Sequence, residues 1–435
     1  METIKRRRGR PKKVVVKDYA QCEIDFTGMQ RLIEKSDIAG QIQVMLEIVR
    51  NNKQEKQWRG MIAVPPTSLL ELIIKEFREK TNIPLEIPFF VFLSLLSGIL
   101  LHKKIKLKIG EDRCVTPNLW TILLAESGAG KTFVSKTIEK SIKDKDKILF
   151  QGTGIVSAAA FVSELSEKNN KLWIRDEFAQ FLRAIESPTG PLSEMKDYCL
   201  RLYDHDRLER KTKKDVITVE EPSLSILGLN ALGSFHKYVT AEMMMDGFSQ
   251  RFQYVVARRD PERPMEKYLD WDVSTKGWDE RWQSIQSCLQ QEYTATSELA
   301  STAVLSSFRV CFSGLGTLDE SFVRRIIWAA HPYALLYHVL RRPEETRLVA
   351  EDYGWAGRLL SMHVADLSYL IGEHNLSVVE KMVRSVEAIR QQVRAKDNRE
   401  ITPRDIVRGI RNIKTTQQAM SLLQFAVNYG AEKTT

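Results

Sequence analysis

The chain has 435 residues, of which 43% are hydrophobic and 28% are charged, and its formal net charge is +9. This length allows two or three domains with full hydrophobic cores, and the composition excludes a fibrous or wholly disordered protein. No apolar run reaches the roughly 20 residues of a membrane span. The basic N-terminus also lacks the apolar segment of a signal peptide. We therefore expect a cytoplasmic protein with no membrane partner.

The first 18 residues form a basic tail. They hold eight lysines and arginines against two acids and few apolar residues, so this segment is predicted to be disordered by itself. The order Arg-Gly-Arg-Pro is typical of an AT-hook, which binds the narrow minor groove of A·T-rich duplex DNA. A generic polyanion-binding tail is the alternative. The residues predicted to contact DNA are Arg6, Arg7, Arg8, Arg10, Lys12 and Lys13.

Helical spacing of apolar residues follows the tail. Residues 19–64 are predicted to form a small helical region, and Pro65-Pro66 marks its end. Two more helices are predicted at Ser68–Thr81 and Pro88–Leu101. The second is apolar except for an interruption by Ser94, Ser97 and Gly98, and is therefore expected to be buried.

The most informative segment is Ala125-Glu126-Ser127-Gly128-Ala129-Gly130-Lys131-Thr132. It follows an apolar strand and precedes a helical pattern, which is the order of a phosphate-binding P-loop. The backbone of Ser127 to Gly130 and the side chain of Lys131 are expected to bind ATP phosphates, and the Thr132 hydroxyl to hold Mg²⁺. One departure is visible, since Ala125 replaces the usual first glycine.

Five apolar strands alternate with helices in this part of the chain. They are predicted at 119–125, 147–150, 171–176, 223–229 and 252–257. This alternation predicts an α/β fold with a parallel sheet, and residues 65–260 are expected to form an AAA+ or RecA-like P-loop NTPase core. Residues 261–374 are predicted to be a helical lid region, with one short strand at Phe308–Ser313.

Two acidic residues follow the third strand. Asp176 and Glu177 end the segment Lys171-Leu172-Trp173-Ile174-Arg175-Asp176-Glu177, which has the pattern of a Walker B element. Asp176 is expected to hold Mg²⁺, and Glu177 to orient or deprotonate the attacking water. Together with the P-loop, these residues predict hydrolysis of the bound nucleotide.

Two further residues each allow two interpretations. Asn230 ends a strand and fits either a sensor of the γ-phosphate or the cap of the next helix. Arg251 follows a Gly-Phe turn and fits either an arginine finger for the nucleotide of a neighbouring subunit or a surface salt bridge. A sensor-2 arginine is less well marked, and Arg324 and Arg325 are its candidates.

Two other basic segments are candidates for DNA contact. The segment 207–214 lies between the Asp-Glu strand and the Asn230 strand, where a loop can enter the channel of a ring; a solvated hairpin is the alternative. Its candidate DNA-binding residues are Arg210, Lys211, Lys213 and Lys214. The segment 375–435 carries 11 basic and six acidic residues. It is predicted to form three helices of helix-turn-helix or winged-helix type, with Thr402 as an N-cap and Pro403 in the first turn. A helical packing module without DNA contact is the alternative.

Several of these segments resemble a YfjI-like family of P-loop proteins from phage, plasmid and genomic-island replication genes. The resemblance covers roughly residues 62–430. It is carried by Ile83–Leu101, Thr116–Thr132, Asp176-Glu177, Pro222–Gly228 and Gly247–Phe252. It implies a replicative helicase, and members are often fused to a primase domain. The stretch before the P-loop is short and helical here, which implies a stand-alone helicase with a separate primase or polymerase.

We therefore expect an ATP- and Mg²⁺-dependent DNA helicase or translocase of a mobile genetic element. It is expected to form a homo-oligomeric ring, most simply a hexamer, with single-stranded DNA in its channel. An origin-binding initiator or helicase loader that uses ATP as a switch is one alternative. A regulatory or defence ATPase with a protein partner is another.

Overall fold

The computed structural model describes residues 64–426 apart from short stretches. These stretches are 142–144, 151–156, 212–215, 245, 261–270, 313–319, 376–377, 411–412, 414, 421 and 424–425. The predicted basic tail, nearly all of the predicted helical region 19–64, and Lys213 and Lys214 lie outside the described residues.

A five-stranded parallel sheet forms the centre of the molecule. Its order is β4-β5-β8-β3-β9, and every neighbouring pair is parallel. The strands are β3 (Trp120–Ala125), β4 (Leu149–Phe150), β5 (Leu172–Arg175), β8 (Ser225–Ala231) and β9 (Gln253–Val256). These match the five predicted strands within three residues. The fold is therefore α/β and compatible with a P-loop or RecA-like core.

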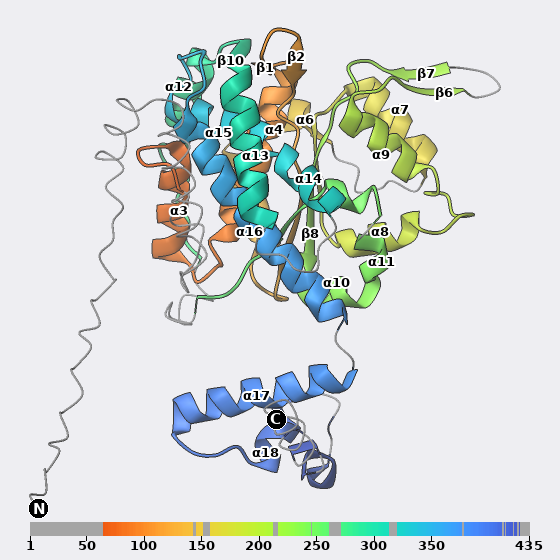
Figure 1. Ribbon diagram of the computed structural model, residues 1–435, viewed down its shortest axis with the longest axis vertical. Coiled ribbons are helices and arrows are strands. Elements are labelled where there is room, and N and C mark those ends of the chain that lie inside the picture. The colour runs from red at the N-terminus through yellow and green to blue at the C-terminus, as the bar shows by residue number, and fades with distance from the viewer. Residues whose placement is uncertain are drawn as a thin grey trace, which may run out of the picture.

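Helices cover both faces of this sheet, as Figure 1 shows. Helix α4 (Glu86–His102) is buried along its whole length up to Leu101 and contacts β3, β5 and β8. A Cβ atom at Gly98 would lie only 2.7 Å from Leu172 Cβ, so glycine lets this helix approach the sheet closely. Within the described part of the chain, no helix combines the length and the apolar character that crossing a membrane requires.

Among the described residues, thirteen further helices pack in the body of the molecule. They are α3 (Leu69–Lys80), α5 (Lys131–Lys140), α6 (Lys145–Ile148), α7 (Ala158–Lys168), α8 (Phe178–Ile185), α9 (Met195–Asp204), α10 (Leu232–Tyr238), α11 (Ala241–Met244), α12 (Trp278–Cys288), α13 (Ser297–Phe312), α14 (Glu320–Trp328), α15 (Ala330–Arg341) and α16 (Ala350–Asn375). A short 3-10 helix, η3 (Ser249–Arg251), precedes β9.

A second sheet was not expected from the sequence. It has the order β10-β1-β2, with β1 (Lys106–Ile109) parallel to β10 (Glu292–Ala295) and antiparallel to β2 (Arg113–Val115). The strand predicted at Phe308–Ser313 is wrong, because residues up to Phe312 belong to helix α13. That helix starts in the alanine-containing segment from Ser297 and continues through the aromatic and β-branched residues that suggested a strand.

One hydrophobic core runs from Leu69 to Ile371. Residues from the predicted core region and from the predicted lid region pack into this same cluster, so the core does not divide at residue 260. A separate small cluster lies in the C-terminal unit and contains Val386, Ile406, Ala419, Leu422 and Ala426.

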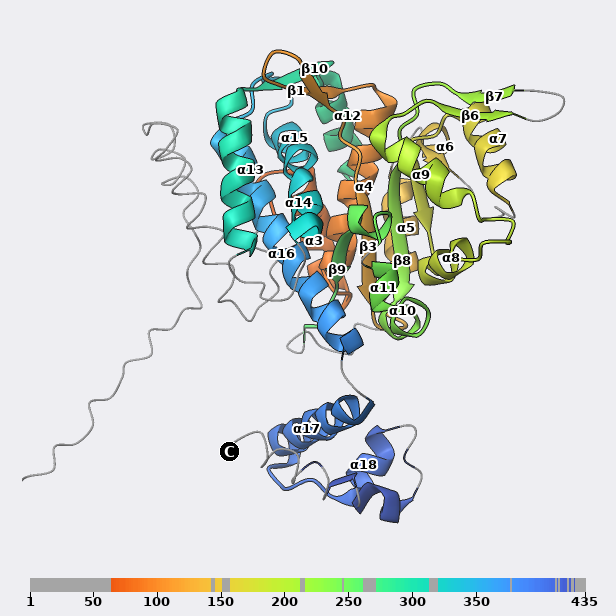
Figure 2. The ribbon, with the colours of Figure 1, turned by 45° about the vertical axis from the view of Figure 1, so that its right-hand side comes forward.

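The C-terminal unit contains α17 (Val378–Asp397) and α18 (Pro403–Gly409). Thr402 caps α18 in a capping box with Asp405, and Pro403 occupies the first turn as predicted. Residues 417–420, at the start of the predicted third helix, are helical. Figure 1 and Figure 2 both show α17 and α18 beyond the end of α16, apart from the body.

Helix α16 covers the outer edge of the central sheet at β9. The Asp366 carboxylate accepts the backbone N–H of Val256 at 3.0 Å, and His363 Nδ1 lies 2.9 Å from the carbonyl oxygen of Tyr254. These are the backbone groups that a sixth strand would pair, because Val255 and Ala257 face β3 instead. Two side chains of a helix thus replace a strand at this edge.

Candidate nucleotide-binding site

The glycine-rich loop leaves the carboxyl end of β3 and enters α5. Gly128 and Gly130 have φ values of +79° and +83°, a region that other residues rarely adopt. A Cβ at Gly130 would also lie 2.7 Å from Ile83 Cδ1 and 3.0 Å from the Trp271 ring. Gly130 is therefore required both by its backbone angle and by its neighbours. The N-terminus of α5 and its free N–H groups point out of this loop.

Lys131 lies behind the loop rather than in open solvent. Its Nζ donates to the carbonyl oxygen of Glu126 at 3.1 Å, and the residue is 9% exposed. Burial lowers the pKa of this ammonium, and the nearby Asp176 and Glu177 carboxylates oppose that shift by raising it. A buried ammonium beside the N-terminus of α5 is well placed to bind phosphate oxygens.

Thr132 and Asp176 meet across the site. The Thr132 hydroxyl donates to Asp176 Oδ2 at 2.8 Å, although the two residues belong to α5 and to the end of β5. A hydroxyl oxygen and a carboxylate oxygen in contact are hard ligands of the kind that Mg²⁺ accepts together with phosphate oxygens and water. The described residues contain no group of three or more His, Cys, Asp or Glu that could hold a metal by itself. The donor set therefore fits Mg²⁺ bound jointly with a nucleotide.

Glu177 is exposed and has an unusual backbone. Its φ of +52° is left-handed, and its N–H donates to Asp176 Oδ1 at 2.9 Å. This turn starts α8 with Glu177 as its N-cap residue. Non-glycine residues in this conformation concentrate at functional sites. The carboxylate is also close enough to Lys131 to affect its pKa.

Asn230 lies next to this turn and caps a different helix from the one predicted. The residue is fully buried, and its Oδ1 accepts the N–H of Ala179 at 3.0 Å while its Nδ2 donates to the carbonyl oxygen of Ala231 at 2.8 Å. It therefore caps α8, the helix behind Asp176 and Glu177, and not α10, which follows it in sequence. Whether it also senses phosphate stays a prediction.

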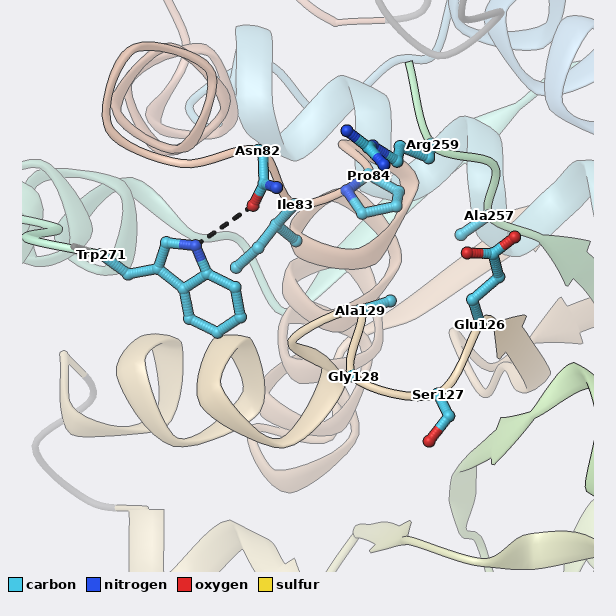
Figure 3. A pocket seen from close by; sticks show the side chains of 10 residues that line it. All are labelled: Asn82, Ile83, Pro84, Glu126, Ser127, Gly128, Ala129, Ala257, Arg259 and Trp271. Carbon is cyan, nitrogen blue, oxygen red and sulfur yellow. Dashed lines mark hydrogen bonds between the residues drawn. The ribbon is translucent and has the colours of Figure 1, made fainter. Parts of the chain in front are cut away.

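A pocket opens beside the P-loop, as Figure 3 shows. It has an empty volume of about 620 Å³, part of it open to solvent, and the Trp271 indole N–H donates to Asn82 Oδ1 at 3.3 Å on one wall. Its lining residues are Asn82, Ile83, Pro84, Glu126, Ser127, Gly128, Ala129, Ala257, Arg259 and Trp271. The apolar part comes from segments before and after the P-loop in sequence.

Arg259 and Trp271 are pocket residues that the sequence analysis did not single out. Arg259 had a usable signal, because it follows β9 by three residues and the carboxyl ends of parallel strands share one edge with the P-loop. Trp271 had none, since it belongs to no predicted strand or helix near the loop.

Arg251 lies at the amino ends of the sheet strands, opposite the carboxyl ends that carry the glycine-rich loop. It precedes β9, and its guanidinium stacks over Tyr203, whose ring packs 5.0 Å from that of Trp120, the first residue of β3. The P-loop follows the last residue of β3, about 17 Å away at about 3.3 Å per residue. Arg251 Nη2 forms an ion pair with Asp204 Oδ2 at 2.7 Å. It therefore does not reach the phosphates of its own subunit.

The basic segment 207–214 contributes the first strand of a hairpin, which is the alternative to a channel loop, and its contact with DNA stays a prediction. Strands β6 (Leu208–Lys211) and β7 (Val216–Val219) pair antiparallel, and the hairpin projects from the body at the upper right of Figure 1. Arg210 and Lys211 lie on its first strand, and Lys211 is exposed. Two of the residues predicted to contact DNA, Arg210 and Lys211, thus lie on a hairpin that projects from the body.

Comparison with known proteins adds no family to these observations. The chain matches no protein-family model, and no curated protein matches its sequence significantly.

Proposed function

We propose that the chain is an ATP hydrolase that moves on or unwinds DNA as a ring of identical subunits. The observation that carries the hydrolase part is the meeting of Lys131, Thr132 and Asp176 at the mouth of a loop shaped by Gly128 and Gly130. Glu177 completes the set from the next position. This arrangement has a cation, a metal-binding pair and a free carboxylate around one anion-binding helix N-terminus.

The proposed chemistry assigns one task to each side chain. Lys131 neutralises the β- and γ-phosphates. Thr132 and Asp176 would hold Mg²⁺, which would supply further neutralisation of the phosphate charge. Glu177 orients a water molecule whose oxygen bonds to the γ-phosphorus as the bond from that phosphorus to the bridging oxygen breaks. The proton of that water passes to the Glu177 carboxylate. Asn230 keeps the start of α8 in place behind this group.

The pocket beside the loop is the proposed site of the nucleotide base. Ile83, Pro84 and Trp271 give it apolar surface, which suits a flat heteroaromatic ring. Arg259 also lines this pocket and can contact polar groups of the ribose or phosphates. The proposed substrate is ATP.

A ring is proposed because Arg251 lies too far from its own P-loop to act there. In the proposed AAA+ or RecA-like assembly, a hexamer in the simplest case, Arg251 reaches the ATP of the neighbouring subunit. The helical region 261–374 then serves as the lid, and the resemblance to YfjI-like replication proteins points to the same arrangement.

The DNA part of the proposal rests on the β6–β7 hairpin and on the basic segments near both ends of the chain. Arg210 and Lys211 would neutralise backbone phosphates of single-stranded DNA without reading its sequence. The C-terminal unit, with its own core and its net positive charge, would bind duplex DNA in the manner of a winged helix. An ATP-switched initiator or loader is the second candidate, because a separate DNA-binding unit serves an origin-binding protein equally well.

ATP turnover of matched lysine variants tests the hydrolase assignment. Lys131→Ala should lower turnover at least about 100-fold, since one phosphate-binding cation is lost. Lys136→Ala removes an exposed lysine from the same helix and should leave turnover within about twofold. Glu177→Gln should bind ATP and hydrolyse it about 100-fold more slowly or worse. Wild-type turnover by Lys131→Ala would refute the assignment.

A further inference from the structure

Two arginines converge on a single backbone oxygen. Arg251 Nη1 and Arg325 Nη1 each donate to the carbonyl oxygen of Gly247 at 2.7 Å. Arg251 belongs to η3 and Arg325 to α14, and Arg325 lies 78 positions after Gly247 in the sequence. Two permanent cations that share one acceptor repel each other, and a nearby anion relieves that repulsion.

Among the described residues, one carboxylate pairs directly with one of these two arginines. Asp204 pairs with Arg251, and its side chain is 44% exposed, whereas that of Arg251 is 16% exposed. None of the described carboxylates forms an ion pair with Arg325. The group formed by Arg251, Arg325 and Asp204 therefore keeps one net positive charge.

The Arg325 guanidinium packs closely against Gly247. A Cβ atom at this position would lie 3.3 Å from Arg325 Nη1, closer than most real contacts of a Cβ. A side chain at this position would require the Arg325 guanidinium to shift by a few tenths of an ångström. Asp246, the preceding residue, is held by an ion pair with Lys196 at 2.7 Å and accepts the N–H of Ser249 at 2.6 Å. The turn that carries the shared oxygen is therefore fixed on both sides.

The position of the pair excludes the nucleotide of the same subunit. Both guanidiniums lie at the amino edge of the sheet, beside Tyr203 and the start of β3, whereas the P-loop lies beyond the carboxyl end of that strand. Arg325, a sequence candidate for a sensor-2 arginine, is thus not beside the phosphates of its own chain. An anion bound by this pair is therefore not the nucleotide held by the P-loop of the same chain.

We propose that Arg325 acts with Arg251 as a second arginine on the ATP bound by a neighbouring copy of this chain. This inference rests on the proposed function. The γ-phosphate spreads its negative charge over three oxygens during transfer, so two guanidiniums can each contact one of them. Asp204 holds Arg251 when no neighbour is present and gives it up when the phosphate arrives.

Mixing of inactive variants tests this assignment. Arg325→Ala and Lys131→Ala should each lose hydrolysis as pure proteins. In mixed rings, some interfaces combine the intact P-loop of an Arg325→Ala subunit with the intact arginines of a Lys131→Ala subunit. Hydrolysis by the mixture should rise at least about tenfold above either parent, because an arginine of this kind contributes a factor of about 10³ or more.

The same experiment separates the competing explanations. If Arg325 acts on its own subunit's nucleotide, no mixed interface is complete and the mixture stays inactive, which would overturn the inference. If Arg325 only stabilises the fold, Arg325→Ala should melt at a lower temperature and a partner subunit should not restore it, which would overturn it as well. Arg325→Gln serves as a second variant if Arg325→Ala does not fold.

Two controls keep this test apart from that of the proposed function. Arg251→Ala mixed with Lys131→Ala should recover in the same way, and Arg201→Ala, which removes an exposed arginine of an i,i+4 pair on α9, should hydrolyse ATP like the wild type. Absence of hydrolysis by the wild type would refute the proposed function. Recovery with Arg251→Ala but not with Arg325→Ala would refute only the role of Arg325.

Discussion

Ala125 shows why the P-loop tolerates a change at its first position. The residue that replaces the usual glycine is the last residue of β3, is fully buried, and pairs with Ala231 of β8. It lies in a regular strand, where a methyl group causes no backbone strain. The two glycines that the loop requires are Gly128 and Gly130, which have positive φ. The sequence pattern could not show this difference between the glycine positions.

His331 is a buried residue with a shifted titration. It is 3% exposed, and its Nδ1 lies 3.0 Å from the Tyr353 hydroxyl. Burial, and secondarily the charge of Arg113, lowers the pKa of His331 from 6.5 to about 4. The folded protein thus keeps this imidazole neutral at pH values where the unfolded chain protonates it.

We predict that this histidine destabilises the fold in acid. As pH falls from about 6.5 to about 4, only the unfolded chain gains the proton, so the free energy of unfolding decreases by about 3 kcal/mol from this residue. His331→Phe removes the titration but leaves a ring in place. Urea unfolding at pH 7 and pH 4.5 should show a smaller pH-dependent loss for the variant. Equal losses in the two proteins would contradict the assigned pKa.

At the level of elements, the edge strand β9 depends on α16. Asp366 is 3% exposed and accepts the N–H of Val256, and its other carboxylate oxygen lies 3.8 Å from Arg258. Without Asp366, that N–H would be buried without its acceptor. The segment Ala257-Arg258-Arg259 continues directly into the pocket wall, so the same contact also fixes the approach to the candidate base site.

We predict that Asp366→Ala destabilises the protein by about 1–3 kcal/mol, the free energy associated with one buried unsatisfied donor. Asp366→Asn keeps an oxygen acceptor for Val256 and should lose less. Urea unfolding of the two variants measures the difference. Equal destabilisation by both substitutions would show that charge, and not the bond to β9, accounts for the role of Asp366.

The sequence predicted the central sheet well because β3, β8 and β9 are runs of mostly apolar residues that are buried at nearly every position, and β5 starts with the buried Leu172 and Trp173. It did not predict β1 and β10. Each has four residues, and residues exposed to solvent alternate with buried ones such as Tyr293 and Ala295, so neither stands out alone. Their pairing joins Leu107 to Tyr293, and no local pattern carries such a contact.

The candidate site divides in the same way. Lys131, Thr132, Asp176 and Glu177 were predictable because motifs at the ends of strands define them. The pairing of Arg251 with Arg325, and the capping of α8 by Asn230, depend on tertiary contacts between distant segments. Sequence spacing predicts residues that belong to local motifs, whereas contacts between distant segments become visible only in the structure.

At the scale of the whole molecule, the amino and carboxyl ends of the central strands carry different groups. The carboxyl edge holds the P-loop, the Asp-Glu turn and the pocket, whereas the amino edge holds the arginine pair and the base of the β6–β7 hairpin. A subunit with a nucleotide site on one edge and arginines on the other can join identical copies head to tail, and such contacts close into rings. This arrangement is the structural basis of the proposed motor.

Strand displacement on a forked DNA duplex tests the central claim most directly. The wild type should release the labelled strand in the presence of ATP and Mg²⁺, and Glu177→Gln should bind the fork without releasing the strand, because it binds ATP but does not turn it over. Lys136→Ala should unwind like the wild type. DNA-stimulated ATP hydrolysis by the wild type without any strand release would contradict a helicase and favour the initiator or loader.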